Sequence, residues 1–355
     1  MKIGFASTDF SQTVKDEKGH PVWGGAGWAR LGQYVNRLPL DVVSGAPAFH
    51  KGVFGVSDWD GRLHFDCDII YLQRAMFSDI PDRMLEARAN GQIIINDIDD
   101  WYWGLSPSNG AFKASHPKLN ERENTNHYRM ILSRSDLVTV STPYLADRIS
   151  KFVECPIVLI RNYIEVDKFS AREQDKTDQP VVGWVGSTAH RSGDLEIMKG
   201  ILDPLQRAGE IRVHHSGYNS GHPRFADAVG IDSEHVTTLP MASPQDYPKL
   251  FKFDVGIVPL SSAPFNEAKS YIKGLEYAAA GIPFVATATQ EYSQLADEGI
   301  GVAVKKSKHW ISELRKLRDP DLRTERAAQY SELVKKHDVS FGADLLTKLF
   351  TQVKP

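Results

Sequence analysis

The segment PFNEAKSYIKGLEYAAAGIPFVAT, residues 264–287, holds the strongest structural signal in this sequence. It follows the apolar run VGIVPL and ends in a second run, PFVAT, and both runs are typical of buried strands. Between them, Lys269–Ala280 has the pattern of a helix that Gly281 ends and that Pro283 cannot continue. The segment therefore predicts a strand, a helix and a second, parallel strand.

The same alternation of short apolar runs and amphipathic stretches continues through the chain. The predicted strands of the first half are KIGFAS, LDVVSG, CDIIYL, GQIIIND, LVTVST and PIVLIRN, with helices at Pro81–Asn90 and Asn124–Ser135. Those of the second half are VVGWVGS, EIRVHHSG, HVTTLP, VGIVPL, PFVAT and IGVAV. This pattern predicts an α/β protein with two Rossmann-like, doubly wound domains. We expect these domains at residues 1–166 and 181–340, joined by a polar linker at 167–180.

Composition agrees with two globular domains and excludes several other classes. The chain has 355 residues, of which 41% are hydrophobic and 25% charged, so it is not disordered or fibrous. The net charge of -3 gives no global basic field for nucleic acid or acidic lipid. Only Cys67 and Cys155 are present, and the sequence has no pattern of a signal peptide or transmembrane segment. We expect a cytoplasmic protein without disulfides.

Lys269 and Ser270 fall in the first turn of the predicted helix. A helix N-terminus with an added ammonium and hydroxyl suits a diphosphate. Lys273 and Glu276 share the face of Lys269, and Glu276 could accept hydrogen bonds from ribose hydroxyls. A surface helix with a solvated Lys–Glu pair fits the same spacing.

A second phosphate-binding candidate opens the second domain. Gly186, Ser187 and Thr188 end a strand, and such small residues let backbone amides approach a phosphate. His190 and Arg191 follow and could add positive charge. A tight turn without a ligand is the alternative.

These stretches, taken in order, resemble the GT-B glycosyltransferases, in particular the family-four group that uses nucleotide sugars. The resemblance implies an acceptor-binding first domain, a donor-binding second domain, and a final helix at residues 341–353 that packs back on the first domain. It also implies that Lys269 and Ser270 bind the diphosphate, that Glu276 binds the ribose, and that Arg191 or His190 neutralises the leaving group. The rest of the implied donor pocket consists of Lys273, Ser216, Gly217, Leu239, Pro240 and Met241.

A glycine-rich stretch, VWGGAGWARLGQYVNRL, follows the first predicted strand. An NAD fingerprint would need a third glycine where Arg30 stands, so a dehydrogenase ranks last among the alternatives. In the resembling enzymes this loop faces the donor across the cleft. The residues concerned here are Gly24, Gly25, Gly27, Trp28 and Arg30.

Asp99 and Asp100 follow the apolar run QIIIN. Asp97 and Asp99 form an Asp-x-Asp pattern, which can hold a divalent metal. The same pattern recurs at Asp58–Asp60 and Asp66–Asp68, so we predict no metal site. By the resemblance, Asp99 and Asp100 lie on the acceptor side, where with His116 they are candidates for a protein base. Trp101 and Trp103 form either a stacking wall for a ligand or buried packing.

The predicted reaction is transfer of a sugar from a nucleotide-diphosphate sugar to an acceptor hydroxyl, with retention and without a required metal or other cofactor. Lys269 and Arg191 are candidate catalytic residues because charge on the departing diphosphate must be stabilised, and Asp99 and Asp100 are candidates for a base. The acceptor is open among a glycan, a small molecule, a protein and a hydroxymethylated base in DNA. The basic segment Lys113–Arg134 motivates the DNA alternative. Ala268, where many members carry a glutamate, motivates a non-catalytic nucleotide-sugar-binding or glycan-binding alternative.

Overall fold

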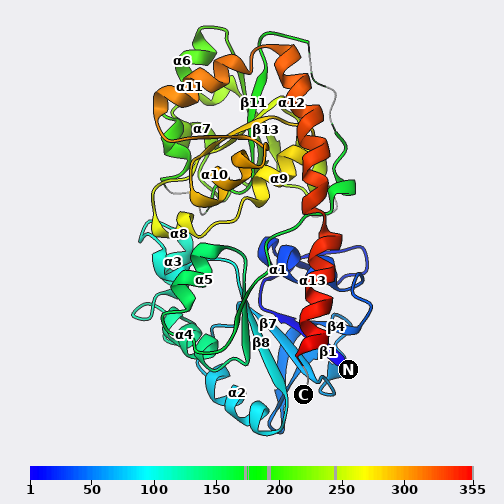
Figure 1. Cartoon of the computed structure of the whole chain (residues 1–355). Helices are drawn as coiled ribbons and strands as arrows, with labels where there is room; N and C mark the ends of the chain where they lie inside the picture. Colours follow the sequence, from blue (N-terminus) through cyan, green and yellow to red (C-terminus); the bar gives the residue numbers. More distant parts are fainter. Residues whose placement is uncertain (172–173, 175, 190–192, 244–245, 354–355) are drawn as a thin grey trace.

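A computed structural model describes residues 1–171, 174, 176–189, 193–243 and 246–353 of the chain. Two sheets lie one above the other, each covered by helices (Figure 1). The eight-stranded sheet has the order β10-β9-β8-β7-β1-β4-β5-β6 and the six-stranded sheet the order β13-β12-β11-β14-β15-β16. In both sheets the first strand of the sequence is central and the chain winds outward on either side. The predicted fold class is therefore confirmed.

All twelve predicted strands are present. The first sheet contains β1 (Lys2–Ser7), β4 (Asp41–His50), β5 (Val53–Ser57), β6 (Leu63–His64), β7 (Ile69–Gln73), β8 (Ile93–Ile98), β9 (Leu137–Val140) and β10 (Ile157–Leu159). The second contains β11 (Val181–Val185), β12 (Arg212–Tyr218), β13 (Val236–Pro240), β14 (Val255–Val258), β15 (Phe284–Thr287) and β16 (Val302–Val304). The antiparallel pairings β4·β5 and β5·β6 and the hairpin of β2 (Phe10–Lys15) with β3 (Pro21–Trp23) were not predicted.

Helices cover both faces of each sheet. In the first half these are α1 (Gly25–Arg30), α2 (Ile80–Ala89), α3 (Gly110–Ser115), α4 (Thr125–Ser133) and α5 (Pro143–Ile149). In the second half they are α6 (Leu202–Arg207), α7 (Phe225–Val229), α8 (Pro264–Glu267), α9 (Ile272–Ala279), α10 (Gln290–Asp297), α11 (Ser307–Lys316), α12 (Pro320–Leu333) and α13 (Val339–Gln352). Within the described residues, each helix is too short or too polar to cross a bilayer.

Strand β7 shows why these strands read as continuous apolar runs. Ile70 and Leu72 belong to the core on one face of the sheet, and Ile69 and Tyr71 to the core on the other face. Successive side chains of a strand point to opposite faces, so a strand covered on both sides has no polar face to alternate with.

The last helix, α13, packs on the first sheet although it follows the second in sequence (Figure 1). The Phe350 ring lies 5.8 Å from that of Phe5 and 5.4 Å from that of Tyr71. The chain thus crosses between the sheets twice, and the two crossings are hydrogen-bonded: Val339 N–H donates to the Ile164 carbonyl at 2.8 Å. Loops that follow strands of both sheets line shared cavities.

Candidate active site

The cleft between the two sheets contains two adjoining cavities, of about 430 and 210 Å³. Both are lined by Gly25 and Ala29 from the first domain and by Ile272 and Lys273 from the second. Parallel sheets bind ligands outside the carboxyl ends of their strands, and the residues that follow β8, β11 and β14 line these cavities. The cleft is therefore the candidate active site.

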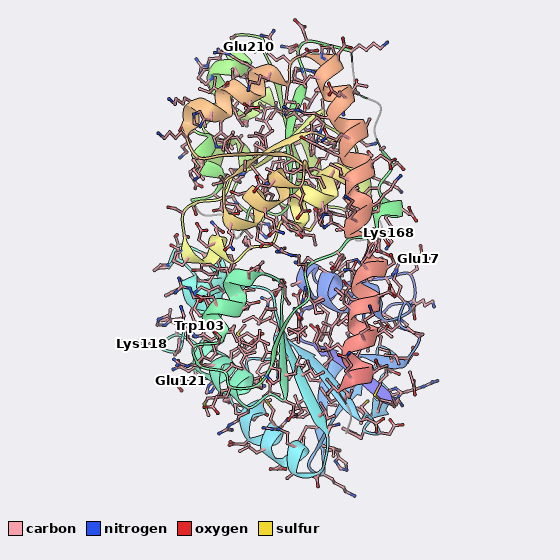
Figure 2. The ribbon with its side chains drawn as sticks, in the orientation of Figure 1. Glu17, Trp103, Lys118, Glu121, Lys168 and Glu210 are labelled. Atoms are coloured by element: carbon pink, nitrogen blue, oxygen red, sulfur yellow. The ribbon has the colours of Figure 1, made fainter. Side chains whose placement is uncertain are left out.

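The segment between β10 and β11, which connects the two sheets, lines part of the larger cavity. Tyr163, Glu165, Lys168 and Phe169 line it there. Lys168, labelled at the junction of the domains in Figure 2, holds its ammonium 4.6 Å from the Trp28 ring centroid. This cation–π contact links the connecting segment to the glycine-rich helix α1.

Lys273, Glu276 and Tyr247 form a hydrogen-bonded network in the wall of the larger cavity. Lys273 Nζ donates to Glu276 Oε2 at 2.9 Å and to the Tyr247 hydroxyl at 2.5 Å, and that hydroxyl donates to Glu276 Oε2 at 2.8 Å. The Lys273 and Glu276 side chains are only 17% and 14% exposed, so this is not a solvated surface pair. The network presents a carboxylate and an ammonium at defined positions along the cavity.

Lys269 and Ser270 line the smaller cavity but do not lie in a helix turn. A short helix, α8, ends at Glu267 and α9 begins only at Ile272, so the prediction of one helix from Lys269 is wrong. Both side chains are held by the first domain: Lys269 Nζ lies 3.3 Å from Asp100 Oδ1, and Ser270 Oγ accepts from Asn162 Nδ2 at 2.7 Å. They remain just before the N-terminus of α9, facing the cavity.

Asp99 and Asp100 enter the smaller cavity from the end of β8. Burial and the neighbouring Asp100 carboxylate raise the pKa of Asp99 to about 7. A carboxyl with such a pKa can hold or release a proton near neutral pH, which suits acid–base chemistry.

The loop after β11 lines the larger cavity with Gly186 and Ser187. Gly186 has a φ of +144° and Gly217 a φ of +105°, and a Cβ on Gly217 would lie 2.8 Å from the Gly186 carbonyl oxygen. Both backbone conformations favour glycine, and Gly217 lets strand β12 approach the loop after β11 closely. Thr188 is buried, and its Oγ1 donates to the Pro223 carbonyl.

Of the other predicted donor residues, Met241 is among the described residues that line the larger cavity. Ser216, Leu239 and Pro240 are not among them. Ser216 is buried, where its hydroxyl donates to the Leu250 carbonyl at 2.7 Å. His190 and Arg191 lie outside the described residues.

In the glycine-rich stretch, Gly24, Gly25 and Trp28 line the larger cavity. Gly27 does not, and its N–H donates to Asp9 Oδ2 at 2.8 Å. The prediction that Arg30 faces the cleft is wrong, because Arg30 is 2% exposed and paired with the buried Asp97 at 2.7 Å.

Trp101, Trp103 and His116 line neither cavity among the described residues. Trp103, labelled in Figure 2, stacks on Tyr128 with ring centroids 6.0 Å apart and planes inclined by 4°. Trp101 and Trp103 are partly buried and pack against the core of the first domain. His116 ends α3, and its ring lies 4.6 Å from that of Phe112.

Sequence reasoning missed several residues of the cleft. The signal for Asn162, Tyr163 and Glu165 was their position at or just after the end of the predicted strand PIVLIRN, since such residues face the ligand side of the sheet. Tyr247 lies in a short turn and offered no signal. The missed residues that line the cavities include Gln33, Asn162, Tyr163, Glu165, Lys168, Phe169, Trp184, Tyr247 and Tyr292.

Comparisons with known proteins agree with this architecture. No family model and no curated protein matches the chain. Among solved structures, sucrose-phosphate synthase from Thermosynechococcus elongatus is 14% identical with a TM-score of 0.67, over 99% of this chain and 98% of that one. HepE of Anabaena, solved with UDP, is 14% identical with a TM-score of 0.62, over 99% of this chain and 100% of that one.

A third similar structure is an α,α-trehalose-phosphate synthase (UDP-forming) from Burkholderia xenovorans, solved with glucose-6-phosphate. It is 13% identical with a TM-score of 0.54, over 79% of this chain and 73% of that one. These likenesses extend over both domains, and they show that the chain has the GT-B fold of glycosyltransferases. The predicted GT-B arrangement is confirmed.

Proposed function

We propose that this protein is a glycosyltransferase that moves a sugar from a nucleoside-diphosphate sugar to an acceptor hydroxyl. The observation that carries the proposal is the cleft wall in which Lys269 and Ser270 lie next to the Lys273–Glu276–Tyr247 network. Two similar structures support it, since HepE of Anabaena was solved with UDP and the α,α-trehalose-phosphate synthase is UDP-forming.

In the proposed complex, the diphosphate occupies the smaller cavity beside Lys269 and Ser270, and Glu276 binds the ribose hydroxyls. The nucleotide then extends along the larger cavity toward Met241. Departure of the diphosphate builds negative charge, which the Lys269 ammonium and the Ser270 hydroxyl stabilise. The Asp100 carboxylate, 3.3 Å from Lys269 Nζ, competes with the diphosphate for this ammonium.

Retention of configuration, independence of metal and other cofactors, and a cytoplasmic location are further parts of the proposal. They rest on the resemblance in the donor segment and, for the location, on the two free cysteines. Under retention the departing phosphate accepts the acceptor proton, and Asp99 is the protein group that could share this proton.

The acceptor binds on the Asp99 and Asp100 side of the cleft. Among acceptor classes, modified DNA gains no specific support, because several cations of the basic segment are engaged within the protein. Arg129 lies 4.8 Å over the Phe152 ring, and Arg134 pairs with Asp82 at 3.0 Å. The acceptor class is a question for screening.

Titration calorimetry with UDP, GDP, ADP and NADH, with magnesium and with EDTA, tests the donor site. We expect one nucleoside diphosphate to bind selectively with and without magnesium, and Glu276→Gln to weaken that binding. Glu313→Gln is the matched control, because Glu313 forms the same i,i+3 pair with Lys316 on α11, away from the cleft. Failure of every diphosphate to bind, or equal weakening by both variants, would overturn the proposal.

A second measurement separates an enzyme from a binding protein. Incubation with the matching nucleotide sugar and a panel of acceptors should release the nucleoside diphosphate faster than incubation without an acceptor. Tight binding with no release under any condition would favour the non-catalytic alternative.

A further inference from the structure

The Asn162 side chain connects the buried core of the first domain to the donor site of the second. It is 5% exposed and lines the smaller cavity together with Ser270. Its Oδ1 accepts a hydrogen bond from Arg30 Nη1 at 2.8 Å, and its Nδ2 donates to Ser270 Oγ at 2.7 Å. Asn162 belongs to the segment after β10, whereas Ser270 precedes α9 in the other domain.

The orientation of this amide follows from the chemistry of its neighbour. A guanidinium carries only donors, so the Asn162 atom that faces Arg30 must be the oxygen. The NH₂ group therefore faces Ser270. Arg30 cannot turn away to permit a flip, because its Nη1 also donates to the Ile160 carbonyl at 2.6 Å and its Nη2 to Asp97 at 2.7 Å.

The orientation of the amide determines what the Ser270 hydroxyl can do. Its oxygen accepts from Asn162, which leaves its single hydrogen to be donated elsewhere. Among the described residues, no acceptor for this hydrogen is found in the protein, and the side chain faces the cavity beside Lys269. A hydroxyl in this state is suited to an anionic oxygen, because hydrogen bonds to charged groups are stronger than neutral ones.

We infer that Asn162 is a positioning residue that commits the Ser270 hydroxyl to donate to the diphosphate of the donor. This inference rests on the proposed function. Asn162 does not touch the reacting atoms itself, and it acts only through Ser270. Because the bond joins the two domains, the hydroxyl is oriented when the domains have the arrangement seen here.

Asn162→Asp is the variant that tests the inference, because it keeps the shape but replaces the NH₂ donor by an acceptor. The carboxylate still satisfies Arg30, and it draws the Ser270 hydrogen toward itself and away from the diphosphate. The affinity for the nucleoside diphosphate that the wild type binds is measured by calorimetry in the wild type, Asn162→Asp, Ser270→Ala and the double variant.

We expect Asn162→Asp to weaken binding about tenfold or more, the range for losing a hydrogen bond to a charged group. In the Ser270→Ala background the same change should weaken binding of the nucleoside diphosphate by less than about threefold, since no hydroxyl remains to be reoriented. Asn36→Asp is the charge control, because Asn36 is exposed and lies outside both cavities. The Asn36→Asp variant should bind the nucleoside diphosphate as tightly as the wild type does.

If Asn162→Asp weakens binding equally in the wild type and in Ser270→Ala, the inference is overturned, because the added charge alone then repels the ligand. Wild-type affinity of Ser270→Ala would also overturn it. If Asn162→Asp does not fold, the same cycle with Asn162→Ala gives the coupling. A wild type that binds no diphosphate refutes the proposed function, whereas binding with an additive cycle refutes only the role of Asn162.

Discussion

The buried ion pair of Arg30 and Asp97 is expected to stabilise the first domain strongly. Asp97 is fully buried, and its carboxylate accepts from Arg30 at 2.7 Å, from the Tyr71 hydroxyl at 3.0 Å and from Thr139 Oγ1 at 2.6 Å. Burial alone would lower the pKa of Arg30, but the Asp97 carboxylate raises it above its ordinary value. The guanidinium therefore stays charged and depends on this partner.

Asp97→Asn replaces one acceptor oxygen by an NH₂ group that faces the N–H groups of Arg30. Removal of one partner from a buried pair costs about 3–5 kcal/mol, because the other charge stays buried without compensation. For a domain of about 150–250 residues, each kcal/mol lowers Tm by about 2–4 °C. The expected decrease for Asp97→Asn is therefore about 6–20 °C.

Thermal unfolding followed by circular dichroism measures this decrease. Asp82→Asn is the matched control, since it makes the same change in an ion pair with Arg134 at 3.0 Å in which Asp82 is 83% exposed. An exposed pair contributes at most about 1 kcal/mol, so Tm should fall by no more than about 4 °C. If Asp97→Asn lowers Tm no further than Asp82→Asn does, the reasoning about the buried pair is refuted.

Two predictions concern the aspartates of the smaller cavity. The pKa of Asp99 is raised to about 7 from an ordinary 3.8, so the folded state loses stability as pH rises through this interval. Asp99→Asn should thus increase Tm, relative to the wild type, more at pH 8 than at pH 5; equal differences at the two pH values would contradict the assignment. Asp100→Asn removes the carboxylate that holds Lys269, so we expect several-fold tighter binding of the nucleoside diphosphate at low salt. Unchanged or weaker affinity in calorimetry would show that Asp100 does not compete with the ligand.

Most of the sheet architecture was predictable because its signal is local. Strands such as β1, β7 and β14 are short apolar runs buried on both faces, and such runs are visible without knowledge of their neighbours. The hairpin of Phe10–Lys15 with Pro21–Trp23 was missed, because its described side chains are exposed or half-buried and it contains no continuous apolar run of strand length. The antiparallel strand Val53–Ser57 was missed as well, although its centre is buried.

The candidate site was predictable where its geometry is local. Lys273 and Glu276 share a wall because i,i+3 positions of a helix are neighbours. The start of that helix was wrong, because Pro264 opens a separate short helix that ends before Lys269. Arg30 was misassigned because its partner, Asp97, lies 67 positions away, a pairing that spacing in one segment does not reveal.

The polar groups proposed to meet the donor diphosphate are held from the opposite domain. Asn162 and Ser270 are 108 positions apart in sequence, and Asp100 and Lys269 are 169 apart. Affinity for the diphosphate therefore depends on the relative position of the domains as well as on the second domain, which carries Lys269 and Ser270. It follows that substitutions in the first domain should change donor affinity through their partners in the second, Asn162 through Ser270 and Asp100 through Lys269, and in opposite directions.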